Sequence, residues 1–286
     1  MAELKFITKE GVAAKRSLEG AHRISFAYTH KDQPKRSKCT KYVGNFSVPF
    51  KETVQRIFTA DTRLSLFHNS NYGNFWRSIK FEDEFNRIQA WVKRQGTRHF
   101  LRDCLDLSVA LDLNLTDNQS GQYTPLGALE ARAKEQPDED AINQLVAYYL
   151  EAITNLPFFR DAKCVAGVPP RPDKLYDLPS TLASQIAKQS DRQDLTNLFR
   201  YTGEKGTVKT LAVDKKWDAW EAAGLTFEPK LTGAPSIILL DDKYQSGTTF
   251  QFVASRLRAA GAGEIYGLCA VKTLRDTDNQ SYGILP

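Results

Sequence analysis

Apolar and polar residues alternate in regular blocks over the second half of the chain. Apolar runs bounded by turn residues predict strands at 163–168, 195–201, 237–240 and 264–271. Apolar residues three or four positions apart predict helices that begin at Pro125 and that span 138–156, 175–188, 217–223 and 248–260. Strands that alternate with helices are typical of a parallel α/β sheet with right-handed crossovers, and we expect that fold class here.

The first half of the chain follows a less regular pattern. The predicted elements are strands at 23–28 and 42–48, a short helix at 51–58, and a long helical pattern at 81–111 that Gly96 interrupts. Residues 67–78 are polar and aromatic without periodicity, which indicates a loop.

A polar segment at 114–124 has the composition of a linker. Thr124 and Pro125 then fit the N-cap and the first position of a helix. We therefore expect an α+β region over residues 1–120 and an α/β domain over residues 121–286.

Positive charge is concentrated in the first 120 residues. They hold 20 lysines and arginines against 13 aspartates and glutamates, a net charge of +7, whereas the whole chain carries +5. Residues 31–41 are a basic loop that either follows the phosphates of a nucleic acid or is simply solvated. Tyr72, Phe75 and Trp76 are suited either to base stacking or to docking of a loop. A nucleic acid or protein partner is thus one option for residues 1–120.

Several classes of protein are excluded by composition. The chain has no run of 18 apolar residues, so we expect no membrane span, and its start has no apolar signal region, so we expect a cytoplasmic protein. The cysteines and the four histidines lack the spacing of a zinc site. We expect buried free thiols at Cys39, Cys104, Cys164 and Cys269.

The stretch from Ser236 to Thr249 is the most informative part of the chain. Four apolar residues run directly into Asp241 and Asp242, and a polar turn that contains Gly247 leads into a helix. Open α/β sheets bind ligands at the carboxyl ends of their strands. Free N–H groups, hydroxyls and the helix dipole make such a turn an anion site, and glycine allows close approach of a phosphate. The predicted ligand is a sugar phosphate whose hydroxyls reach the two carboxylates.

This stretch resembles the 5-phosphoribosyl-1-pyrophosphate (PRPP) binding motif of the type I phosphoribosyltransferases. Lys243 departs from the family pattern, which usually has an aliphatic residue there. Gln245 replaces the aspartate of the enzymes that act on 6-oxopurines, which argues against purine salvage of that type. An ordinary strand, turn and helix with a coincidental pair of aspartates is the alternative. The positions that match the motif are Asp241, Asp242, Ser246, Gly247 and Thr249.

The resemblance implies roles for these residues. In the family, the acidic pair holds the ribose hydroxyls and the turn grips the 5-phosphate. Asp241 and Asp242 are then the catalytic pair and the protein side of the Mg²⁺ site. The residues expected to bind PRPP are Asp241, Asp242, Tyr244, Gln245, Ser246, Gly247, Thr248 and Thr249.

Two further segments extend the resemblance. Residues 168–178 look like the pyrophosphate loop of ComF-type phosphoribosyltransferases, which implies contacts from Pro169, Pro170 and Arg171. Residues 202–216 are either a lid whose Lys205 and Lys209 reach the diphosphate or a solvated connector. The resemblance covers roughly residues 145–275 and implies a parallel-sheet phosphoribosyltransferase core, to which residues 1–120 are an added α+β region.

The implied activity is transfer of a phosphoribosyl group from PRPP, or a related ribose phosphate, to an acceptor, with Mg²⁺ and release of pyrophosphate. No residue identifies the acceptor. One alternative is a non-catalytic PRPP- or nucleotide-sensing regulatory protein, which Lys243 and Gln245 favour. Another is an effector or toxin subunit of a bacterial anti-phage defence system, such as a retron, which the basic first part favours. Because family members are commonly dimers, a homodimer is also an option.

Overall fold

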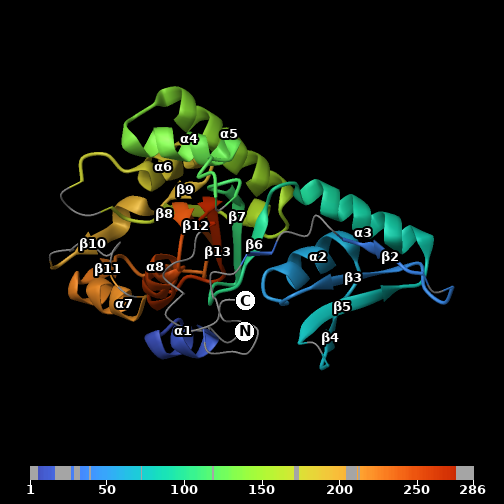
Figure 1. Ribbon diagram of the computed structural model, residues 1–286. Helices are drawn as coiled ribbons and strands as arrows, with labels where there is room; N and C mark the ends of the chain where they lie inside the picture. Colours follow the sequence, from blue (N-terminus) through green and yellow to red (C-terminus); the bar gives the residue numbers. More distant parts are fainter. Residues whose placement is uncertain are drawn as a thin grey trace.

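A seven-stranded sheet forms the centre of the molecule (Figure 1). The computed structural model describes residues 6–16, 27–28, 33–38, 40–71, 73–117, 119–170, 174–203, 211 and 213–274. In spatial order the strands are β1 (Ala27–Tyr28), β6 (His99–Leu101), β7 (Leu107–Leu113), β13 (Ile265–Lys272), β12 (Ile237–Tyr244), β8 (Cys164–Gly167) and β9 (Gln193–Asp194). The five strands from β7 to β9 are parallel, whereas β6 and β1 pair in antiparallel fashion. A mixed α/β fold with a mostly parallel sheet is therefore confirmed.

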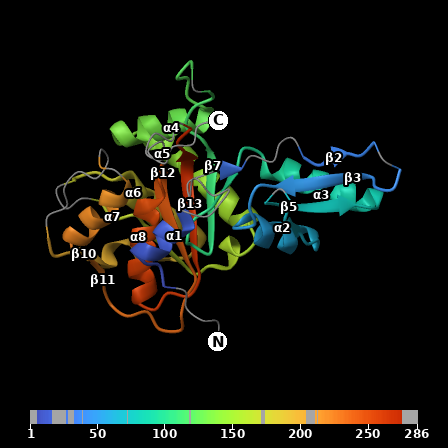
Figure 2. The same ribbon diagram turned by 60° about the horizontal axis from the view of Figure 1, so that its bottom comes forward.

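Helices cover both faces of this sheet (Figures 1 and 2). One face carries α4 (Pro125–Glu135), α5 (Glu139–Asn155) and α6 (Leu178–Ser190). The other carries α7 (Val213–Ala222), α8 (Thr248–Ala259) and α1 (Lys9–Arg16). The predicted N-cap is confirmed, because the Thr124 hydroxyl accepts a hydrogen bond from the Gly127 N–H at 2.9 Å.

Strand β12 is buried on both faces, as its apolar sequence predicts. Ile238 and Leu240 belong to the core beneath α4, α5 and α6, and Ile237 and Leu239 belong to the core beneath α7 and α8. All four side chains are fully buried. The strand does not end at Leu240, but continues through the aspartate pair to Tyr244.

The predicted helical pattern over 81–111 is correct only in its first half. Helix α3 (Glu82–Gln95) ends at Gly96, whose φ of 58° is a left-handed value that glycine adopts without strain. Residues beyond it form β6 and β7, so the expectation that the helix resumes was wrong. Strand β7 packs against a core on each face, and a short run that is apolar on both sides has no period that separates strand from helix.

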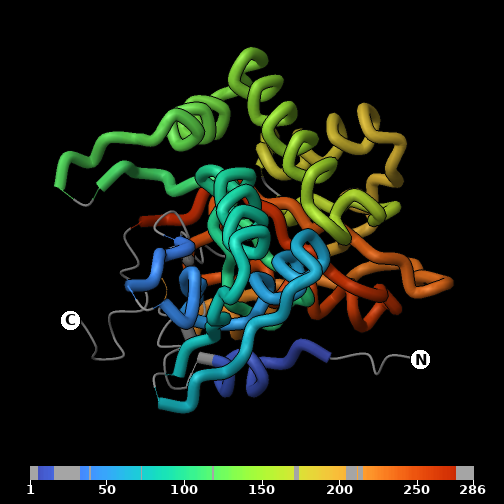
Figure 3. Tube along the Cα trace, turned by 90° about the vertical axis from the view of Figure 1, so that its right-hand side faces the viewer, coloured from blue at the N-terminus to red at the C-terminus, as the bar shows by residue number. Residues whose placement is uncertain are grey.

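A second, smaller sheet lies beside the first. Its antiparallel strands are β2 (Lys35–Arg36), β3 (Gly44–Val48), β5 (Asn74–Ile79) and β4 (Phe67–Asn69), in that order, with α2 (Val54–Thr62) and α3 packed on it. Figure 3 shows α2 and α3 in front of the main sheet, seen from the side of the smaller sheet. The expected loop at 67–78 is in fact the β4–β5 hairpin, and most of β5 is only half-buried, so its sequence lacks clear alternation.

Trp91 joins the two sheets into one core. This fully buried ring packs against Phe46 and Phe58 of the smaller sheet's layer, with centroids 5.9 and 5.2 Å away, and against Phe100 of β6 at 5.7 Å. Strands β1, β6 and β7 of the main sheet also come from the first 120 residues. The boundary expected near residue 120 therefore does not coincide with a division between the sheets.

A two-stranded ribbon lies outside the main sheet. Strand β10 (Phe199–Tyr201) pairs in antiparallel fashion with β11 (Leu225–Phe227), and α7 lies in the segment between them. The strand predicted over 195–201 is thus confirmed only in its second half, because Thr196–Leu198 form a short 3₁₀ helix, η2. A second 3₁₀ helix, η1, spans Phe159–Asp161.

Candidate functional site

The two segments expected to bind the ligand leave neighbouring strands at the same edge of the sheet. Strands β12 and β8 are parallel, with Leu240 opposite Gly167. The Val168 N–H then donates to the Leu240 carbonyl at 2.8 Å, just before Pro169 begins the predicted pyrophosphate loop. The aspartate pair and this loop therefore lie side by side, at the position where open α/β sheets bind ligands.

The turn after β12 is compact and well enclosed. Gly247 has φ of 74° and directly precedes α8. A β-carbon at this position would lie 2.1 Å from the Tyr244 hydroxyl, so only glycine fits. The hydroxyls of Ser246 and Thr248 are 3.1 Å apart, and both residues are buried. A turn with left-handed backbone at Gly247 therefore leads directly into the first turn of α8.

This turn encloses a small cavity of about 170 Å³. Six of the eight residues expected to bind PRPP line this cavity. The other two, Asp242 and Thr248, are not among the described residues that line it. The described lining residues are Lys216, Asp241, Lys243, Tyr244, Gln245, Ser246, Gly247, Thr249 and Phe250. The hydroxyls, two lysines and a helix N-terminus give it the character of an anion site.

Asp241 is the carboxylate that faces this cavity. Burial raises its pKa well above the usual value, and the neighbouring Asp242 raises it further, whereas Lys134 opposes the shift. The Asp242 N–H donates to Asp241 Oδ1 at 3.0 Å, and the hydroxyl of Tyr149 on α5 donates to the Asp241 carbonyl at 2.6 Å. A cationic ligand or a metal ion near Asp241 would favour its ionised form.

Asp242 faces helix α4 instead. Its Oδ2 lies 2.5 Å from Lys134 Nζ, and its side chain is only 9% exposed. Glu130, which is completely buried, lies 2.8 Å from Lys243 Nζ and 3.5 Å from Lys134 Nζ. Burial and Asp242 raise the pKa of Glu130. Although burial opposes the charge on Lys134, Asp242 and Glu130 raise its pKa. These four residues, Glu130, Lys134, Asp242 and Lys243, form a charge cluster between α4 and β12.

Sequence reasoning missed three residues near the site. Lys216 of α7 is buried and lines the small cavity. Glu130 and Lys134 complete the charge cluster from α4. One signal was available for Glu130, because a lysine at 243, where an aliphatic residue is usual, requires a carboxylate partner when it is partly buried. Nothing in the local sequence of α7 indicates the position of Lys216.

The predicted pyrophosphate loop borders a second cavity, of about 430 Å³, beyond the end of β8. Pro169 and Pro170 line it together with Lys174 and the first turn of α6. The Asp177 carboxylate caps α6 by accepting from the Ser180 N–H at 3.0 Å, and it lies 3.6 Å from Lys174 Nζ. Arg171, Lys205 and Lys209 lie outside the described residues.

The described residues contain no group of three or more histidine, cysteine, aspartate or glutamate side chains arranged to hold a metal ion. Mg²⁺ usually takes one or two carboxylates and completes its shell with water and substrate phosphates. Asp241 fits that role because it faces the cavity, whereas Asp242 is engaged by Lys134. A substrate-bound Mg²⁺ with Asp241 as its protein contact is therefore compatible with the residues present.

Other sequence expectations are met in part. Cys104, Cys164 and Cys269 are free, with the latter two buried, and Cys39 lies outside the described residues. In the basic loop, Arg36 binds Glu82 with both of its terminal nitrogens, at 2.5 and 2.8 Å. None of the helices in the described part of the chain is both long and apolar enough to cross a membrane.

Comparison with known proteins gives little further information. No family model and no curated protein matches the chain. Among solved structures, it is similar to adenine phosphoribosyl transferase from Trypanosoma brucei, in a complex with AMP, pyrophosphate and ribose-5-phosphate. The identity is 10%, the match covers 58% of this chain and 83% of that one, and the TM-score is 0.34.

Proposed function

We propose that this protein binds PRPP, or a related ribose phosphate, at the carboxyl edge of the main sheet and transfers its phosphoribosyl group to an acceptor. The observation that supports this most is the cavity behind β12. There the turn containing Gly247 and the carboxylate of Asp241 line one small space together with two lysines. This is the combination that a phosphate attached to a polyhydroxyl sugar requires.

The 5-phosphate occupies the turn. Its oxygens accept hydrogen bonds from the free N–H groups at the start of α8 and from the hydroxyls of Ser246 and Thr249. Lys216 and Lys243 supply positive charge at the same cavity. Gly247 allows the backbone to approach the phosphate without a side chain between them.

Asp241 orients the ribose, because its carboxylate lies at the cavity wall and accepts hydrogen bonds from sugar hydroxyls. The diphosphate extends toward the neighbouring cavity, where Pro169, Pro170 and Lys174 lie beside the first turn of α6. Mg²⁺, when bound, supplies charge neutralisation for the diphosphate oxygens. Asp242 holds the end of β12 in place through Lys134 and Glu130 rather than contacting the sugar.

In the transfer step, a nucleophilic atom of the acceptor forms a bond to the anomeric carbon of the ribose. The bond from that carbon to the diphosphate oxygen breaks, and pyrophosphate leaves with the electron pair. Positive charge develops on the ribose during this exchange, and the Asp241 carboxylate stabilises it. The proton of the acceptor leaves to solvent or to the departing pyrophosphate.

A second candidate is a protein that binds the ribose phosphate without transferring it. The observation that favours this reading is the ion pair between Asp242 and Lys134, which leaves one carboxylate instead of two at the cavity. With a single carboxylate, the charge that develops on the ribose is less stabilised. Binding and transfer must therefore be measured separately.

Calorimetric titration of PRPP, with and without Mg²⁺, tests the binding part. We expect saturable binding by the natural protein and a loss of at least about tenfold in affinity for Asp241→Asn, because one charge-assisted contact disappears. Asp191→Asn is the matched control, since Asp191 is exposed at the end of α6. Release of pyrophosphate with a panel of nucleobase acceptors then separates the two candidates. An absence of PRPP binding by the natural protein refutes both.

A further inference from the structure

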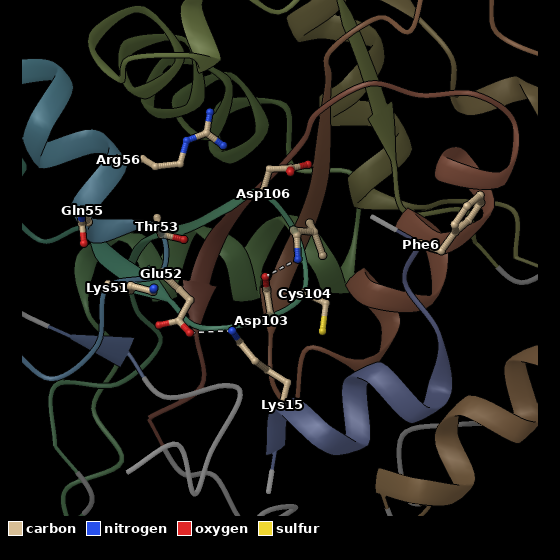
Figure 4. A pocket seen from close by; sticks show the side chains of 11 residues that line it. Phe6, Lys15, Lys51, Glu52, Thr53, Gln55, Arg56, Asp103, Cys104 and Asp106 are labelled. Atoms are coloured by element: carbon tan, nitrogen blue, oxygen red, sulfur yellow. Dashed lines mark hydrogen bonds and ion pairs between the residues drawn. The ribbon is translucent and has the colours of Figure 1, made fainter. Parts of the chain in front are cut away.

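A larger cavity lies away from the site described above. It measures about 760 Å³ and is bordered by α1, the first turn of α2 and residues 103–106, which lead into β7 (Figure 4). Among the described residues, none lines both this cavity and the small cavity behind β12. Its volume is within the range of pockets that bind metabolites.

The carboxylates in this cavity already have partners. Glu52 lies 2.6 Å from Lys15 Nζ, as Figure 4 shows, and 3.2 Å from Arg102 Nε. These cations lower the pKa of Glu52 although its burial opposes the shift. Asp106 lies 2.5 Å from Arg258 and also accepts from the Ile265 N–H at 2.8 Å. Asp103 accepts hydrogen bonds from the Leu105 N–H at 2.9 Å, the Ser108 hydroxyl at 2.9 Å and the Tyr244 hydroxyl at 3.0 Å. Each of the three carboxylates that line the cavity is thus already bound by other groups of the protein.

Around the cavity, positive charge exceeds negative charge by one when the described lining residues are counted with their ion-pair partners. The cations are Lys15, Lys51, Arg56, Arg102 and Arg258, and the carboxylates are Glu52, Asp103, Asp106 and Glu264. Lys51 lines the cavity, and its Nζ lies 5.8 Å from the centroid of the Phe75 ring. Among the described residues, none of the ion pairs involves Lys51. Arg56 lines the cavity from the first turn of α2 and forms an ion pair with Glu264 at 2.7 Å, and its side chain is 38% exposed. Burial raises the pKa of Asp103, which disfavours its charged form. The cavity therefore favours an anion.

One wall of the cavity is apolar. The ring of Phe6 is 71% exposed and lies across the cavity from Arg56 in Figure 4, and Leu105 also lines the cavity. Burial raises the pKa of the Cys104 thiol to about 12, so this lining side chain stays protonated and acts as a weakly polar surface. An exposed aromatic ring beside a cationic wall suits a ligand with both a flat ring and an anionic group.

We propose that this cavity is a second ligand site, which takes a small molecule that carries a phosphate or carboxylate and a flat ring, of the size of a nucleoside monophosphate. The anionic group binds at Lys51 and Arg56, and the ring packs on Phe6.

The wall of this cavity is hydrogen-bonded to the phosphate turn. The Tyr244 hydroxyl donates to Asp103 Oδ2 at 3.0 Å. Asp103 lines the large cavity and Tyr244 lines the small one, so this hydrogen bond connects the walls of the two cavities. The Cys104 N–H donates to Gln251 Oε1 at 3.1 Å, and Gln251 Nε2 donates to the Gly247 carbonyl at 3.2 Å. A ligand that shifts residues 103–104 therefore shifts the turn. This coupling rests on the proposed function, whereas binding in the large cavity does not.

Titration of uridine 5′-monophosphate into the full chain by calorimetry tests the site, with uridine and inorganic phosphate as its two halves. We expect the monophosphate to bind more tightly than either half. Lys51→Glu should weaken binding by about tenfold or more, because it reverses one charge at the anion. Lys230→Glu, the same charge change at an exposed residue between β11 and β12, should leave it unchanged. Because the monophosphate is itself a ribose 5-phosphate, the proposed function predicts a second binding event at the carboxyl edge of the sheet. Asp241→Asn should weaken that event and leave the Lys51-dependent one unchanged.

Two results would overturn the proposal. One is an absence of saturable binding by the natural protein. The other is binding that Asp241→Asn removes and Lys51→Glu does not, which would place the nucleotide at the carboxyl edge of the sheet. If the natural protein does not bind PRPP but binds the monophosphate in a Lys51-dependent way, the proposed function fails and the second site stands.

The coupling has its own measurement. The affinity for ribose 5-phosphate, measured with and without saturating uridine 5′-monophosphate, should differ, and by linkage the reverse titration should show the same ratio. Direct competition at the turn also lowers this affinity, so the ratio is compared with that of Lys51→Glu, in which only competition remains. Tyr244→Phe removes the hydroxyl that binds Asp103, so in this variant the ratio should approach that of Lys51→Glu. An equal ratio in the natural protein and in Tyr244→Phe would refute the connection through Asp103.

Discussion

Substitution of Gly247 by alanine tests the proposed phosphate turn directly. The residue combines two constraints, a φ of 74° and a neighbouring hydroxyl that would lie 2.1 Å from an added β-carbon. Gly233 separates the two constraints, because its φ is 73° and no atom lies within 4 Å of its added β-carbon. The pair of variants Gly247→Ala and Gly233→Ala therefore differs in contact and not in backbone strain.

The expected losses follow from these geometries. Left-handed backbone costs a residue with a β-carbon about 1–2 kcal/mol, and this is the full expectation for Gly233→Ala. Gly247→Ala adds overpacking against Tyr244, which typically costs about 1–3 kcal/mol, for a total of roughly 2–5 kcal/mol. Tyr244→Phe in the same chain removes the closest atom but leaves the ring carbon at 2.5 Å, so only part of the loss should be recovered.

Urea unfolding followed by tryptophan fluorescence measures these differences, provided that the slope m is unchanged. Calorimetry with PRPP on the same proteins should show weakened binding for Gly247→Ala and unchanged binding for Gly233→Ala. The reasoning is refuted if both variants lose the same stability. It is refuted as well if the effects of Gly247→Ala and Tyr244→Phe simply add, because contacting residues should couple.

Three further predictions concern buried groups. Because burial raises the pKa of Asp103, the stability that its proton supplies is present at low pH and is lost as pH rises from about 4. Asp103→Asn should therefore flatten the fall in urea midpoint between pH 4 and 8, and parallel curves would contradict this. Glu130→Gln should lower the free energy of unfolding by roughly 1–3 kcal/mol. This is less than the loss for a fully buried ion pair, because Lys243 is 29% exposed and can be solvated again. An unchanged urea midpoint would contradict a stabilising role of the charge cluster. Trp91→Ala should lower the free energy of unfolding by about 3–5 kcal/mol. The protein should still unfold in one transition, because the two sheets share one core, in which Trp91 also contacts Phe100 of the main sheet. Two transitions would indicate separate domains.

The candidate site was predictable where its residues are neighbours in sequence. The apolar run before Asp241, the turn at Gly247 and the helix after it determine one another locally. The structure has the strand, the turn and the helix in the predicted order, although β12 continues to Tyr244. The partner of Asp242 was not predictable, because Lys134 is more than 100 residues away and reaches it only through the packing of α4 on β12. Side chains alternate along β12, so the adjacent Asp241 and Asp242 point to opposite sides of the strand. The sequence predicted that the strand ends before the aspartates, and a loop at that place has no such alternation.

The fold was predictable to the same extent. Helices that show one apolar face, such as α5 and α6, were located correctly, and so was the strand before the aspartates. Strands β6 and β7 were assigned to a helix, because a short run buried on both sides carries no period. The hairpin β4–β5 was assigned to a loop because its half-buried faces do not alternate clearly.

The sequence alone determined the α/β class and the order of strand, turn and helix around Gly247. Both depend on interactions between residues a few positions apart, namely periodic burial, capping and the left-handed freedom of glycine. Only the tertiary structure decided that Asp241 faces the cavity and Asp242 faces Lys134, that Lys216 joins the site, and that the first 120 residues share the main sheet. These features depend on strand pairing and helix packing between segments that are far apart in the sequence. The local pattern of apolar and polar residues does not specify which distant segments pack together.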